Sequence, residues 1–105
     1  MHIHTKIMNL YKEYELIQTQ INQLEDLKKP VDRALRIRQM QILETLDDEF
    51  VKSGKESIDV DLVRIRYNSM LQYLAEKLGL PVEKYIENLK QLAQRMGISF
   101  EELNG

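Results

Sequence analysis

The sequence predicts an all-α protein, a helical bundle or coiled coil with a long N-terminal helix, a bend at Pro30, a second helix and then a compact group of two to three shorter helices. Three observations indicate this fold. Apolar residues recur at alternating steps of four and three along the first part of the chain, which is the heptad spacing of a packed helix. In residues 82–96 apolar residues follow the i, i+3, i+4, i+7 spacing of an amphipathic helix. The 105 residues include only four glycines and two prolines, and the remaining composition favours helices.

The first helix is expected from about residue 3 to residue 28. One of its faces carries a ladder of apolar residues, which we call the seam: Ile3, Ile7, Leu10, Tyr14, Ile17, Ile21 and Leu24. So narrow a stripe needs a partner helix to cover it. Pro30 lacks a backbone N–H and kinks or breaks the helix. The first helix therefore either folds back on the second as a hairpin or projects and forms a coiled coil, and the seam does not decide between these arrangements.

The second helix is expected from residue 31 to about residue 52, because a further set of apolar residues shares one face: Val31, Leu35, Ile42, Leu43, Leu46 and Phe50. Its first half is basic and its second half is acidic, which opposes the helix dipole. One hypothesis is that Arg33 and Arg36 pair with Asp47 and Asp48 of a second copy in an antiparallel, two-fold arrangement.

A third helix is expected to follow the loop at residues 53–58 and to end at about residue 78. Its apolar residues lie on two faces. The larger face consists of Val60, Val63, Tyr67, Met70, Leu71, Leu74 and Leu78. Leu62, Ile65 and Tyr73 lie on the opposite side. A helix that is apolar on two faces is either central in a bundle or sandwiched between its own core and a partner.

The fourth helix is expected over residues 82–96, with Gly97 at its end, and residues 99–102 form a capping box that opens a short last turn. Residues 74–85 resemble residues 92–103: both have a helix end, a glycine, an apolar residue tucked under and a new helix. This echo reflects either similar capping chemistry or a duplicated recognition corner. We expect an association region at residues 1–53 and a small helical bundle at residues 54–105, folding as one cooperative unit.

Residues 74–81, with the sequence Leu-Ala-Glu-Lys-Leu-Gly-Leu-Pro, resemble the first half of the helix-turn-helix motif of DNA-binding repressors. Ala75 stands where that motif packs a small residue, and Gly79 stands at its turn. The resemblance implies a recognition helix that begins at Val82. That helix carries Glu83 and Glu87, which would be repelled by phosphates.

The sequence contains no motif for reaction chemistry. It has no cysteine, and its two histidines, His2 and His4, have no third metal ligand nearby. The acidic residues at 44 and 47–49 are typical of a solvated helix face. We therefore expect no enzyme activity, no catalytic residues, no cofactor and no metal. No apolar run approaches the roughly 20 residues that span a bilayer, so we expect no membrane partner, and the composition fits a cytoplasmic protein.

These observations predict a non-catalytic helical interaction protein, a self-associating or accessory subunit of a larger assembly. Its partner is a protein, either a second copy in a homo-oligomer or a larger complex. The expected interface residues are Ile7, Leu10, Tyr14, Ile17, Ile21, Leu24, Leu62, Ile65 and Tyr73. The alternative is a small nucleic-acid-associated subunit, either a regulator or a ribonucleoprotein component. Its phosphate contacts would be Lys29, Arg33, Arg36, Arg64 and Arg66. The formal net charge of −2 gives no global attraction to nucleic acid.

Overall fold

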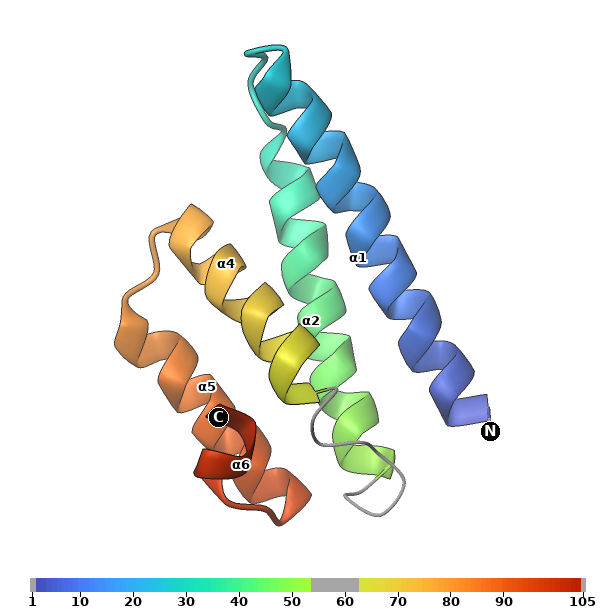
Figure 1. Cartoon of the computed structure of the whole chain (residues 1–105), viewed down its shortest axis with the longest axis vertical. Helices are drawn as coiled ribbons and strands as arrows, with labels where there is room; N and C mark the ends of the chain where they lie inside the picture. Colours follow the sequence, from blue (N-terminus) through green and yellow to red (C-terminus); the bar gives the residue numbers. More distant parts are fainter. Residues whose placement is uncertain (1, 54–62, 105) are drawn as a thin grey trace. The chain divides into compact units, whose positions relative to one another are not determined.

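The computed structural model describes residues 2–53 and 63–104, and of residues 2–4 it describes the backbone alone. The described residues form helices and turns and no β-strand, which confirms the all-α prediction. The elements are α1 (His2–Asp26), α2 (Arg33–Ser53), the π-helical turn η1 (Val63–Tyr67), α4 (Asn68–Leu78), α5 (Val82–Met96) and α6 (Phe100–Asn104) (Figure 1).

The chain divides into two compact units, Met1–Leu46 and Asp47–Gly105. The boundary falls inside α2, whereas the sequence places its division in the loop that begins at residue 53. Most of that loop lies outside the described residues, as do Val60 and Leu62.

The first unit is an antiparallel hairpin of α1 and the part of α2 that ends at Leu46 (Figure 1). Pairs of polar side chains join the two helices. Arg38 donates two hydrogen bonds to the Glu13 carboxylate, with distances of 2.6 and 2.9 Å. The Gln39 amide donates to the Gln18 Oε1 atom at 2.9 Å, and Arg36 Nη2 lies 4.0 Å from Glu25 Oε1. Of the two arrangements that the seam left open, the structure has the hairpin.

The seam is largely buried within the chain. Ile7, Tyr14, Ile17 and Ile21 are buried, and Leu10 and Leu24 are half-buried. The sequence analysis missed Tyr11, which is fully buried beside them. Positions 7, 11, 14, 18 and 21 also alternate in steps of four and three, so they form a second ladder on the same face as the seam. Tyr11 belongs to this second ladder.

The reversal between the two helices depends on a Schellman motif at the end of α1. The Lys29 amide donates to the Leu24 carbonyl at 2.8 Å, and the Lys28 amide donates to the Glu25 carbonyl at 3.0 Å. Lys28 has φ of 56°, the only positive φ of a non-glycine residue in the described chain. The first helix therefore ends before Lys28, and the break predicted from Pro30 is confirmed as a complete reversal.

The start of α2 is capped by Asp32. Its Oδ1 atom accepts a hydrogen bond from the Ala34 amide at 3.0 Å, which satisfies one of the free N–H groups of the first turn. The basic residues that follow are balanced by acids from α1, since Arg38 binds Glu13 and Arg36 lies beside Glu25. These acids of α1 offset the unfavourable interaction between the basic first half of α2 and the helix dipole.

The second unit is built around Tyr67, the last residue of η1, which is fully buried. Its ring packs edge-on against Phe50, with ring centroids 5.6 Å apart. Its hydroxyl accepts a hydrogen bond from Asn88 at 3.3 Å. The neighbouring Asn68 donates to the Leu103 carbonyl at 3.4 Å, so that consecutive side chains both reach into the unit. The other buried apolar residues of this unit are Val63, Leu74, Ala75, Leu89, Leu92, Ala93, Met96 and Leu103.

Two further Schellman motifs turn the chain between α4, α5 and α6. Gly79 and Gly97 have φ of 71° and 74°. The Leu80 amide donates to the Ala75 carbonyl at 2.8 Å, and the Ile98 amide donates to the Ala93 carbonyl at 3.0 Å. At the second corner the Ser99 amide also donates to Glu102 Oε2 at 3.1 Å, which is one half of the predicted capping box.

Replacement of Lys28 by glycine is expected to raise the free energy of unfolding by up to about 1 kcal/mol. The left-handed conformation costs an L-residue roughly 1–2 kcal/mol, and the greater freedom of glycine in the unfolded chain offsets part of this gain. Urea unfolding measures the difference. The matched control is Lys29→Gly, which we expect to lower stability by about 0.5–1 kcal/mol. Equal losses in the two variants would contradict the assignment of a left-handed residue at Lys28.

The ion pair between Glu13 and Arg38 predicts a pH dependence of stability. The hydrogen bond from Arg38 lowers the pKa of Glu13 below its ordinary value of 4.5; partial burial opposes this shift and charge attraction adds to it. The pair therefore stabilises the fold above about pH 4.5, and this contribution is lost as the pH falls through the lowered pKa.

Both side chains are more than one-third exposed, so we expect wild type to exceed Glu13→Gln by at most about 1 kcal/mol at pH 7. Urea unfolding between pH 3 and pH 7 tests this. The difference should vanish at the acid end, whereas the exposed control Glu44→Gln should stay within about 0.5 kcal/mol of wild type at pH 7. A Glu13→Gln difference that persists below the lowered pKa would show that the ion pair is not its cause.

Candidate interaction surface

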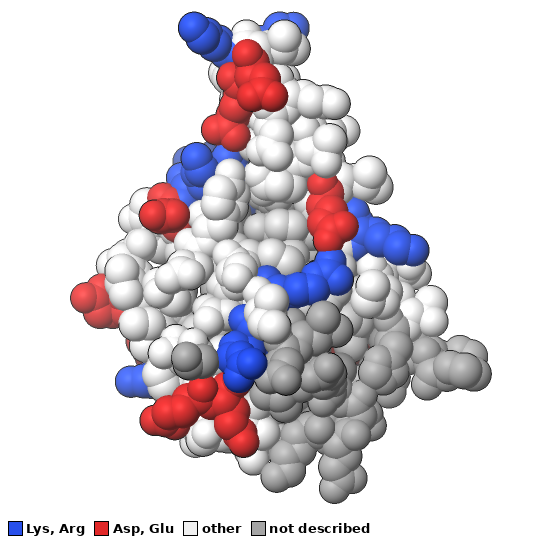
Figure 2. Space-filling model, in the orientation of Figure 1, with Lys and Arg blue, Asp and Glu red and all other residues white. Residues whose placement is uncertain are grey.

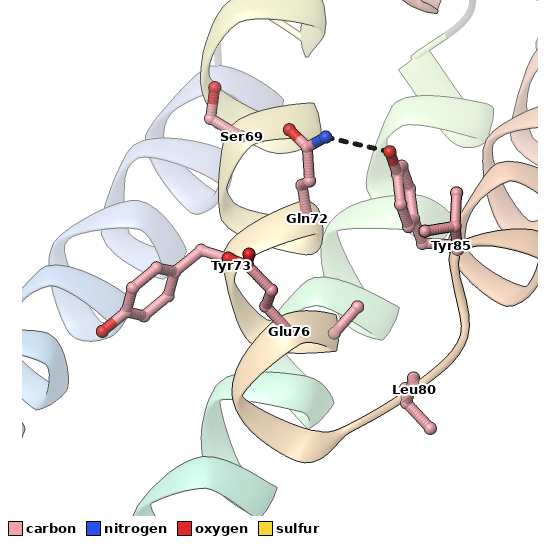
Figure 3. A pocket seen from close by; sticks show the side chains of 8 residues that line it. Ser69, Gln72, Tyr73, Glu76, Leu80 and Tyr85 are labelled. Atoms are coloured by element: carbon pink, nitrogen blue, oxygen red, sulfur yellow. Dashed lines mark hydrogen bonds between the residues drawn. The ribbon is translucent and has the colours of Figure 1, made fainter.

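A groove lies at the corner where α4 turns into α5 (Figure 3). Its volume is about 280 Å³. Residues of α4, of the connecting turn and of the first turn of α5 line it: Ser69, Gln72, Tyr73, Ala75, Glu76, Leu80, Val82 and Tyr85. All of them belong to the second unit. The groove is therefore a local feature of this corner.

A hydrogen bond holds the two sides of the groove together. The Gln72 Nε2 atom donates to the Tyr85 hydroxyl at 2.9 Å across the space between the helices (Figure 3). Glu76 lies one turn further along α4 and contributes a carboxylate. The Lys77 ammonium lies 5.5 Å from the centre of the Tyr73 ring. The groove thus combines uncharged polar groups with a single carboxylate in its lining.

Two apolar side chains at this corner stand open to solvent. Leu80 is 45% exposed and Val82 is 56% exposed. Leu80 lies on the connection that leads from α4 into α5 (Figure 3). The sequence analysis expected an apolar residue tucked under this turn, but Leu80 is exposed in that position. Leu80 precedes α5, and Val82 is the first residue of that helix.

The corner between α5 and α6 provides an internal comparison. It repeats the same spacing, so that Ile98, Phe100 and Leu103 correspond to Leu80, Val82 and Tyr85. Ile98 and Phe100 are half-buried, and Leu103 is fully buried. The two corners therefore share their capping geometry and differ in how far their apolar side chains are covered.

The structure distributes the predicted interface residues over several environments. Ile7, Tyr14, Ile17 and Ile21 of the seam are buried within the chain, whereas Leu10 and Leu24 are half-buried and partly open to solvent. Ile65 is 62% exposed on η1, and Tyr73 is half-buried in the groove. Leu62 lies outside the described residues. The sequence analysis missed two residues at this surface, Leu80 and Val82. The only feature of the sequence that could have indicated their exposure is their position at the end of a helix.

The predicted phosphate contacts do not form one exposed stripe. Lys29 and Arg33 are exposed, but Arg36 is only 8% exposed and lies beside Glu25. Arg64 and Arg66 are half-buried on η1. Figure 2 shows both basic and acidic side chains on this face of the molecule.

Two charges of the two-fold hypothesis have partners within the chain. Arg36 lies beside Glu25, and Asp48 accepts a hydrogen bond from Arg95 at 3.0 Å within the second unit. Among the described residues, no three histidine, aspartate or glutamate side chains are grouped so as to hold a metal ion. The side chains of His2 and His4 are not among those described.

No protein-family model, curated protein or solved structure matches the chain. Within the described residues, no helix combines the length and the apolar character needed to cross a membrane. The function must therefore be argued from the surfaces of the chain itself.

We expect filter binding at low salt to show no retention of RNA or DNA by this protein, because Arg36 lies beside Glu25 and Arg64 and Arg66 are half-buried. Retention that fades steeply with salt would contradict this expectation. The double variant Lys29→Glu with Arg33→Glu then identifies the contacts, since it should abolish retention if the basic stripe binds phosphates.

Proposed function

We propose that this protein is a non-catalytic helical interaction protein, an accessory subunit that binds a partner protein through the groove between α4 and α5. The observation that carries the proposal is the exposure of Leu80 and Val82 at the groove. Exposed apolar side chains beside a hollow favour contact with another molecule. Its action in the cytoplasm stays a prediction of the sequence.

The comparison of the two corners supports this assignment. In the corner between α5 and α6, the side chains at the equivalent positions are half-buried or buried. In the corner between α4 and α5, Leu80 and Val82 have no such cover among the described residues. A partner that covers Leu80 and Val82 would give the first corner the burial that the second has within the chain.

The lining of the groove favours a peptide segment of a protein. Ala75, Leu80 and Val82 offer apolar contact for a side chain inserted between the helices. Tyr85 provides aromatic surface, which is enriched in protein interfaces. Glu76 offers a carboxylate that a lysine or arginine of the partner would match. The favoured partner segment therefore presents an apolar residue beside a basic one.

Replacement of Val82 by glutamate tests this proposal. Val82 is more than half exposed, so the variant should keep the circular dichroism and unfolding midpoint of wild type. Affinity purification under native conditions should recover one stoichiometric protein with wild type and not with Val82→Glu. Gln91→Glu, an exposed change on the same helix, is the matched control and should recover that protein as wild type does.

The recovered protein is then purified and titrated directly against the three forms. A tenfold or greater loss of affinity for Val82→Glu relative to Gln91→Glu, equivalent to about 1.4 kcal/mol, would support the groove as the binding surface. Equal affinities for all three forms would overturn its assignment.

A further inference from the structure

The last residue of α6 is an asparagine that glycine follows. Asn104 ends the helix, and Gly105 comes directly after it in the sequence. The Asn104 side chain is exposed and makes no hydrogen bond to the described part of the chain. Asparagine is one of the chemically labile residues of proteins. Glycine has no side chain to hinder the approach of its main-chain nitrogen to the asparagine before it. These two residues therefore favour a reaction between the Asn104 side chain and the main chain.

The reaction balances with water as its only co-reactant. The main-chain nitrogen of Gly105 attacks Cγ of Asn104 and forms a new bond to it. The bond from Cγ to the side-chain nitrogen breaks, and ammonia leaves with the proton that the Gly105 nitrogen gives up. Water then opens the resulting succinimide ring at either carbonyl carbon. One opening gives aspartate, and the other gives isoaspartate, in which the main chain runs through the former side chain.

The fold separates Asn104 from the other asparagines. The attack requires the next main-chain nitrogen to approach the asparagine side chain, and within a helix that nitrogen is held by its own hydrogen bond. The chain contains four other asparagines, and each is followed by a residue of the same helix: Asn9, Asn22, Asn68 and Asn88. Among the described helices, α6 alone ends with asparagine. Asn104 is therefore the asparagine at which helical structure hinders the reaction least.

Asn68 shows what the structure adds to the sequence. It precedes Ser69, whose small side chain hinders the attack little in an unfolded chain. In the folded protein the Asn68 Nδ2 atom donates a hydrogen bond to the Leu103 carbonyl at 3.4 Å. Because α4 continues directly from η1, the main chain on both sides of Asn68 is helical. We therefore expect Asn68 to be protected in the folded protein.

We propose that Asn104 is a site of spontaneous deamidation, at which the folded protein accumulates aspartate and isoaspartate through a succinimide. Each event replaces a neutral amide by a carboxylate, so the formal net charge changes from −2 to −3. The new charge joins the exposed Glu101 and Glu102 at the end of a helix, where negative charge is unfavourable. The altered main chain begins after Leu103, so the buried side chain of Leu103 keeps its place.

Incubation of the purified full chain in mildly basic buffer tests the proposal. Peptide mapping by mass spectrometry should show the exchange of NH2 for OH at Asn104 and should identify isoaspartate as well as aspartate there. The rate should fall in mildly acidic buffer, because the attacking nitrogen must lose its proton. The matched control is Gly105→Val, which keeps Asn104. It should react at least about tenfold more slowly, because a β-branched side chain restricts the attacking residue.

A parallel incubation in urea tests the protection by the fold. Asn68 should stay intact in the folded protein and should react once urea has unfolded the chain. Asn104 should react under both conditions. Reaction of Asn68 in the folded protein at the rate of Asn104 would contradict the selection by helical structure.

An intact Asn104 in incubated wild type would overturn the proposal. Aspartate without isoaspartate would also overturn it, because direct hydrolysis of the side chain gives aspartate alone. Equal rates in wild type and Gly105→Val would exclude the part assigned to Gly105. These results are independent of the binding experiment with Val82→Glu, which reports on the groove between α4 and α5.

Discussion

The first unit depends on the reversal of the chain between α1 and α2. Lys28 adopts a left-handed conformation there, and the hydrogen bonds from Lys28 and Lys29 close the end of α1. Asp32 then opens α2. Without this reversal the seam would face solvent and would need another chain to cover it. Because the reversal occurs within the chain, the second helix of the hairpin covers the seam.

The helical class, the break at Pro30 and the final capping turn follow from the sequence, because heptad spacing, proline and the Ser-x-x-Glu pattern act locally. The polar contacts between the two helices of the hairpin do not follow from the sequence. Arg36 and Gln39 are buried, yet both interrupt the apolar pattern of the second helix. Their burial depends on Glu25 and Gln18 of the other helix, and a single-helix pattern contains no information about partners so far away in the chain.

The groove was harder still to predict. Its lining combines α4 with the start of α5, so it depends on how two helices lie together, which the residue spacing within either helix does not show. Residues 92–103 show that the same capping chemistry also occurs with covered side chains. The echo in the sequence thus predicted two similar turns correctly, but the difference in exposure between them required the tertiary structure.

The buried amide of Gln39 has a consequence for the alignment of the hairpin. Its Nε2 atom donates a hydrogen bond to Gln18, and its Oε1 atom is buried with no hydrogen-bond partner in the described part of the chain. A purely aliphatic seam tolerates slippage by whole turns, since isoleucine would replace isoleucine. If α2 slipped by one turn, about 5.4 Å, Gln39 would also lose Gln18, at a cost of roughly 1–3 kcal/mol. The amide of Gln39 therefore costs some stability but favours a single register of α2 against α1.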